Sequence, residues 1–202
     1  MFAEPRWMGS LLAVHSSTLF VSLLPFLLLA TLLLALIYVL YAARNRRPSP
    51  RSNWNSWEQL LYLVLLVSVI ILAITSFYPV LRHEAMKGWS LFIHMVGAGV
   101  FVFLLPALAV TWCEASRFQL GSDTPETSDP APRFYWLPKS LFWLLLASGL
   151  VVSLTMLFSM TELFGTEGLE LLLEIHRYSG LIVVATVLLH LSSIVLQRLG
   201  WR

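Results

Sequence analysis

The chain has 202 residues, of which 58% are hydrophobic and 12% charged, and its formal net charge at pH 7 is +2. Its mean hydropathy is +0.78. This composition excludes a soluble globular domain and is typical of an integral membrane protein. We therefore expect the lipid bilayer as its surroundings, and no nucleic-acid partner.

Five apolar runs are long enough to cross a membrane, since a spanning helix needs about 20 such residues. They lie at residues 19–42, 60–81, 91–112, 141–160 and 171–196. The sequence predicts an all-α integral membrane bundle of five transmembrane helices, with too little remaining chain for a soluble catalytic domain. The first run ends in RNRR without a small-residue cleavage site, so we expect it to be a retained anchor.

The distribution of basic residues predicts the orientation of the chain, because Lys and Arg near span ends mark the cytoplasmic side. Nine of them fall on the side that holds the loops after the first and third spans and the carboxyl terminus, against four on the other side. We expect the amino terminus outside and the carboxyl terminus in the cytoplasm.

Three of the five histidines, His94, His176 and His190, lie well inside predicted spans. Polar groups at membrane depth are costly and tend to be functional, and inward-facing histidines on neighbouring helices form cofactor sites in bundles. His94 lies near the start of the third span and His176 near the start of the fifth, and both spans run in the same direction. The two histidines therefore share a depth, which predicts one haem held between two helices. His15 and His83 lie at span edges, where we expect interfacial roles.

Small residues follow both of these histidines. Within about a turn of these histidines lie Gly97, Ala98, Gly99, Ser179 and Gly180, and missing side chains there would let a flat macrocycle approach the backbone. Arg177 could pair with a haem propionate. An arginine at a span end is also an ordinary interfacial anchor, and a histidine in a span can also be a packing residue bonded to a carbonyl.

His190 lies 14 residues after His176. At 3.6 residues per turn, the two rings leave one helix face about 21 Å apart, so one helix could serve two stacked sites. A zinc site would need three or four converging ligands, whereas haem iron needs only two axial ligands. The histidine pattern therefore favours haem over zinc.

Four segments within residues 56–198 carry a resemblance to a known family. They are SWEQLLYLVLLVSVIILAITSF, IHMVGAGVFVFLLPALAVTW, KSLFWLLLASGLVV and EIHRYSGLIVVATVLLHLSSIVLQR, the last with its H-x13-H spacing. They resemble the four-helix b-type cytochrome subunits of respiratory formate dehydrogenases and nickel-iron hydrogenases. The resemblance implies a four-helix cytochrome b-like domain at residues 56–202, preceded at 1–55 by an extra transmembrane helix and a basic cytoplasmic loop.

The resemblance also implies a function. Such subunits take electrons from an iron-sulfur or c-type cytochrome subunit on the outer face, pass them through two stacked b haems, and reduce quinone near the cytoplasmic face. The chain would then be an electron-transfer subunit of an oxidoreductase complex in a bacterial or archaeal inner membrane, rather than a stand-alone enzyme. His94 and His176 match the ligands of the outer haem.

The inner end departs from the family pattern. His190 matches an inner-haem ligand, but the position of its family partner is Tyr62. A tyrosine ligates iron as the phenolate, which is costly to form in apolar surroundings, so we expect one haem b and not two unless a partner chain supplies a ligand. The family's quinone-site run Asn-Ala-Gly-Gln-Lys reads YWLPK here and keeps only Lys139, so a quinone could instead use the space near Tyr62 and His190.

Two other functions remain open at this point. The first is a haem-poor membrane anchor or assembly scaffold of such a complex, which the tyrosine at position 62 favours. The second is a histidine-based ion or proton pathway. That pathway predicts acidic residues in mid-span, whereas the acidic residues of this sequence lie near span ends.

Overall fold

The computed structural model describes residues 6–44, 55–114, 116 and 136–198, with side chains from residue 19 to residue 196 within those ranges. All regular structure in this part of the chain is helical. The helices are α1 (Arg6–Arg44), α2 (Ser56–Leu81), α3 (Trp89–Trp112), α4 (Trp136–Ser159) and α5 (Thr166–Arg198). Each is long and apolar enough to cross a membrane. The predicted five-helix membrane bundle is confirmed, although α1 begins well before the first apolar run.

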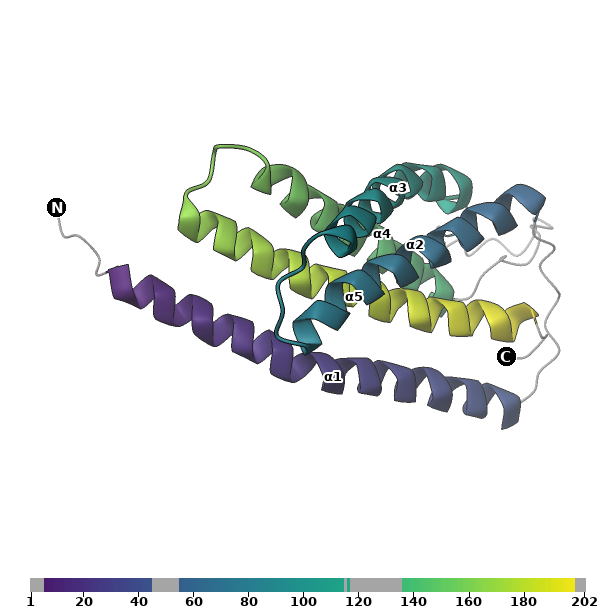
Figure 1. Ribbon diagram of the computed structural model, residues 1–202. Coiled ribbons are helices and arrows are strands. Elements are labelled where there is room, and N and C mark those ends of the chain that lie inside the picture. Colours follow the sequence, from purple (N-terminus) through teal and green to yellow (C-terminus); the bar gives the residue numbers. More distant parts are fainter. Residues whose placement is uncertain (1–5, 45–54, 115, 117–135, 199–202) are drawn as a thin grey trace, which may run out of the picture.

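Helices α2 to α5 form a ring of four. Each packs on the next along the chain, and α5 closes the ring by contacting α2. Helix α1 packs on α5 outside this ring (Figure 1). It is the least buried of the five spans, while α5 is the most buried. Because neighbours in the ring are α2–α3 and α4–α5, helices α3 and α5 lie diagonally opposite each other.

The start of α2 is fixed by a capping box, in which the side chains at both ends of the first turn bond to backbone N–H groups. The Glu58 N–H donates to the Asn55 side chain, and the Asn55 N–H donates to Glu58 Oε2 at 2.9 Å. The Ser56 N–H also donates to Asn55 Oδ1, at 2.8 Å. These bonds satisfy donors that the helix itself leaves without partners. The capping box therefore fixes Ser56 as the first residue of α2.

Helices α3 and α4 approach closely at Gly149. A Cβ atom at this position would lie 2.7 Å from Leu105 Cδ2 and 3.2 Å from Phe101 Cζ. A small residue of this kind allows the backbone of one membrane helix to approach the side chains of another. Such close contacts matter because membrane helices associate by van der Waals packing and not by the hydrophobic effect. Gly149 thus sets the distance between the two helices.

The apolar core fills only one half of the ring. We call this the His190 half, and its buried side chains are Leu61, Leu65, Val69, Phe101, Leu104, Leu105, Leu108, Trp112, Phe142, Leu145, Val183, Val187 and Ile194. These come from the first half of α2 and α4 and from the second half of α3 and α5. The other half contains His94 and His176, and we call it the His94 half. A cofactor could be accommodated there.

Replacing Gly149 by leucine should destabilise the bundle by about 1–3 kcal/mol, because the added side chain collides with Leu105 and Phe101. Detergent-induced unfolding followed by circular dichroism measures this loss. Ala147→Leu is the matched control, since Ala147 is exposed on the same helix. Equal stability of the two variants would contradict the close approach of α3 and α4.

Candidate cofactor site

A cavity of about 300 Å³ lies in the His94 half of the ring. This volume is at the lower end of the range for cofactor and small-molecule sites, about 300–1,000 Å³. Its walls are mainly apolar and come from all five helices, and the polar side chains among them are Ser76, His94, Ser153, His176 and Arg177. An apolar cavity with a few convergent polar groups is the common form of a cofactor site.

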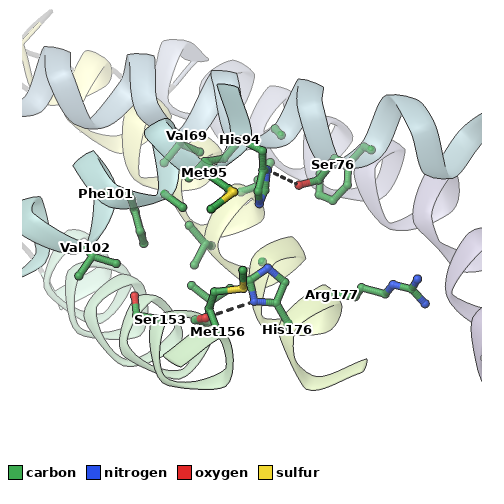
Figure 2. Close-up of a pocket in the computed structure, with 18 of the residues that line it drawn as sticks. Val69, Ser76, His94, Met95, Phe101, Val102, Ser153, Met156, His176 and Arg177 are labelled. Atoms are coloured by element: carbon green, nitrogen blue, oxygen red, sulfur yellow. Dashed lines mark hydrogen bonds between the residues drawn. The ribbon is translucent and has the colours of Figure 1, made fainter. Parts of the chain in front are cut away.

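The cavity brings His94 of α3 and His176 of α5 together. Their ring centroids are 6.5 Å apart and the ring planes are inclined by 67°, and Figure 2 shows the two rings pointing toward one another. Two imidazoles that share one metal ion through bonds of about 2 Å have ring centroids about 6 Å apart. The observed spacing therefore fits one iron between the two rings. That they ligate a haem stays a prediction.

Hydrogen bonds from α2 fix the orientation of His94. Its Nδ1 lies 3.0 Å from Thr75 Oγ1 and 3.3 Å from Ser76 Oγ. The Thr75 hydroxyl donates to the Ile71 carbonyl at 2.7 Å, so its oxygen is left to accept from the ring. From the Thr75 acceptor we assign the hydrogen of this imidazole to Nδ1 and the lone pair to Nε2.

His176 is fixed in the same way by α4. Its Nδ1 lies 3.2 Å from the Val152 carbonyl oxygen, which can only accept, and 3.2 Å from Thr155 Oγ1. The Thr155 hydroxyl itself donates to the Val152 carbonyl at 2.8 Å. This ring also carries its hydrogen on Nδ1.

The two histidines thus share one arrangement. Each has its Nδ1–H bonded to a neighbouring helix and its Nε2 lone pair available. A metal-ligating histidine almost always donates its other ring N–H to an oxygen acceptor, which fixes the tautomer and raises the basicity of the ligand. The donor set and its supporting bonds therefore fit a haem with two histidine ligands.

Gly97 and Gly99 lie on two different surfaces of α3. Gly99 lines the cavity, and a Cβ atom there would have no atom within 4 Å. Gly97 is placed elsewhere, because a Cβ atom on it would lie 3.3 Å from Ile71 Cγ2 on α2, and it lies outside the cavity lining. On α5, Gly180 lines the cavity, and a Cβ atom on it would have its nearest neighbour, Val152 Cγ2, at 3.9 Å. Gly99 and Gly180 therefore offer open backbone to a flat group, whereas Gly97 serves the packing of α2 on α3.

Arg177 lies at the edge of this site. It lines the cavity and is half-buried, and its side chain extends away from the gap between the two imidazoles (Figure 2). It is the one cation among the lining side chains of the described chain. Its position fits a partner for an acidic group at the rim, and not a ligand at the centre.

His190 has different surroundings. Its ring centroid lies 6.0 Å from that of Tyr62, and the cavity that the two side chains share has a volume of about 20 Å³, which is room for about one water molecule. Leu65, Phe142 and Leu145 occupy the remaining space. A second porphyrin does not fit here, and neither does a quinone head group. The buried Nδ1 of His190 has no hydrogen-bond partner among the described residues, in contrast to His94 and His176.

The remaining sequence candidates lie apart from the cavity. His83 is exposed in the turn after α2, where its φ is 54°, and Lys139 is buried in the first turn of α4. The side chain of His15 and residue 135 lie outside the described residues. The described part of the chain has no group of three or more His, Cys, Asp or Glu side chains that could hold a metal ion.

Sequence reasoning missed the residues that hold the two rings, namely Thr75, Thr155 and the Val152 carbonyl, and it missed the contribution of Phe20 on α1 to the cavity wall. Hydroxyl residues in spans usually bond back to their own helix, as Thr31 and Thr111 do here. No signal in the sequence distinguishes Thr75 and Thr155 from these.

The chain matches no family model, no curated protein and no solved structure. A function for this chain is therefore inferred from the geometry of the cavity and from the sequence.

The hydrogen-bond network predicts the tautomer of both rings in the haem-free protein. Nitrogen NMR of histidine-labelled protein in micelles should show His94 and His176 as Nδ1–H tautomers, because each Nδ1 faces an acceptor. His83→Gln, His94→Gln and His176→Gln variants assign the signals, and exposed His83 serves as the freely exchanging reference. Finding the Nε2–H tautomer at both positions would contradict this network.

Proposed function

We propose that this multi-pass membrane protein is a b-type cytochrome that holds one haem b between His94 and His176. In this proposal it is the membrane subunit of a larger redox complex. It relays electrons between a partner on the outer face, an iron-sulfur or c-type cytochrome subunit, and the quinone pool.

One observation carries the proposal. Two imidazoles on diagonally opposite helices face each other with centroids 6.5 Å apart across an apolar cavity, and each is held by its Nδ1 so that Nε2 is directed to ligation. Packing histidines also need an acceptor for a buried N–H, but packing alone does not require two supported rings to face each other across one cavity. A pair of haem ligands does require this, since ligand orientation is set by such outer bonds.

Bound at this position, haem b would supply a one-electron carrier. His94 and His176 would take both axial positions, so the site suits electron relay and not the binding of oxygen. The open backbone at Gly99 and Gly180 would receive the faces of the macrocycle, and Arg177 would bind an acidic group at the rim. The apolar walls would keep water from the iron, which together with the ligands sets the reduction potential.

The orientation and the membrane belong to the same proposal. We place the amino terminus outside and the carboxyl terminus in the cytoplasm of a bacterial or archaeal inner membrane. The excess of basic residues on one side supports this orientation. The cavity then lies toward the outer face, near a donor protein. In this proposal the quinone binds away from His190, where the space admits only about one water. Lys139 is buried at the same end of the bundle.

A haem-poor membrane anchor is the second candidate. It is favoured by Tyr62 and by the dense packing around His190, which leave one of the two expected haem positions of the family without room for a porphyrin. This candidate predicts that the cavity between His94 and His176 binds no haem either.

The absorption spectrum of the purified protein separates the two candidates. Protein produced with sufficient haem should show a reduced α band in the b-type region, and the His94→Ala and His176→Ala double variant should lose it because no axial ligand remains. His83→Ala is the matched control, since His83 is exposed and outside the cavity. A wild-type protein without this band, or a double variant that keeps it unchanged, would refute the cytochrome.

The two cavities also predict the haem stoichiometry. A pyridine haemochrome assay should give one haem per chain, because a second porphyrin does not fit beside His190. His190→Phe should keep this ratio within the error of the assay. Two haems per chain, with one lost in His190→Phe, would contradict the packing of that half.

A further inference from the structure

Among the described side chains of α1, which begin at residue 19, Phe20 is the one that reaches the cavity. This ring is 3% exposed and lines the cavity together with residues of the four-helix ring. It packs with Leu24 and Leu181, and these three residues form a second apolar cluster, separate from the core of the His190 half. The side chains packed around this cluster come from α1, α2 and α5, and they are Leu28, Phe77, Val80 and Tyr178. Phe20 therefore lies where α1, α2 and α5 meet.

Phe20 is held against the helix that carries His176. Its ring contacts Tyr178 edge to face, with centroids 5.1 Å apart and planes at 89°, which is a favoured aromatic geometry. Tyr178 follows Arg177 and lies two residues after His176. A displacement of Phe20 would thus open the cavity beside the axial ligand of α5 without removing that ligand.

The rest of α1 is mostly exposed. Leu24 is fully buried, and Thr31 and Ala42 are also buried, whereas most large apolar side chains between Leu27 and Leu40 face outward. Among the described aromatic side chains of α1, Phe20 has the smallest exposed fraction, and it lies in the wall of the cavity.

We propose that α1 is part of the cofactor site and that Phe20 closes the side of the cavity between α2 and α5, so that it separates the bound group from lipid and water. This inference deepens the proposed function and depends on it. Because exposure to solvent stabilises the more highly charged oxidised haem, opening this side lowers the reduction potential. It also gives small water-soluble oxidants access to the edge of the haem.

The test compares wild-type protein, Phe20→Ala and Phe26→Ala in the full-length chain loaded with haem. Phe26 is the matched control, because it is a phenylalanine of the same helix with 69% of its surface exposed. The readouts are the midpoint potential from a spectroscopic redox titration and the rate at which ferricyanide oxidises the reduced protein. We expect a lower potential and several-fold faster oxidation in Phe20→Ala, and wild-type values in Phe26→Ala.

The outcomes separate this inference from the proposed function. A b-type band in all three proteins with the same potential and oxidation rate overturns the role of Phe20 and leaves the cytochrome intact. A wild-type protein that binds no haem overturns both. If Phe20→Ala does not assemble, Phe20→Leu keeps most of the side-chain volume and removes only the ring, and the same shifts in smaller amount are expected.

Discussion

The hydrogen bonds at the Nδ1 atoms of His94 and His176 are the interactions on which the rest of this site depends. Each joins a ring on one helix to oxygen atoms on its neighbour, from α3 to α2 and from α5 to α4. A buried imidazole whose N–H had no acceptor would cost about 1–3 kcal/mol, so these bonds determine which nitrogen faces the cavity. The positions of the two Nε2 atoms are therefore set by all four helices of the ring, and not by α3 and α5 alone.

The two halves of the ring are packed differently. The His190 half is filled by apolar side chains, which gives α2 to α5 a rigid common core. The His94 half contains the cavity instead. The apolar side chains that line this cavity lack packing partners on one side. A group that fills the cavity supplies those contacts, so the fold and the bound group stabilise each other.

Much of the fold follows from the sequence. The five apolar runs predict the five helices. The pairing of His94 with His176 follows from depth, because two spans that run in the same direction bring equivalent positions to one level. Depth along a helix is fixed by the rise per residue, which the sequence determines directly.

Other features of the site depend on rotation about the helix axes and on which helices are neighbours. Gly97 and Gly99 are two residues apart, yet only Gly99 lines the cavity, and an apolar span carries almost no periodic signal from which this could be predicted. The supports from Thr75 and Thr155, and the wall formed by Phe20, require knowledge of the contacts between helices. The narrow space at His190 likewise results from Leu65 on α2 and from Phe142 and Leu145 on α4, which individually look like any other core residue.

Electron paramagnetic resonance of the oxidised, haem-loaded protein tests the central claim most directly, because the spin state of ferric haem reports its axial ligands. The arrangement of His94 and His176 predicts one low-spin species per chain with the signature of two imidazole ligands, which is lost in either single alanine variant and kept in His190→Ala. A high-spin signal in the wild-type protein, or a low-spin signal that depends on His190 and not on His94, would contradict the account.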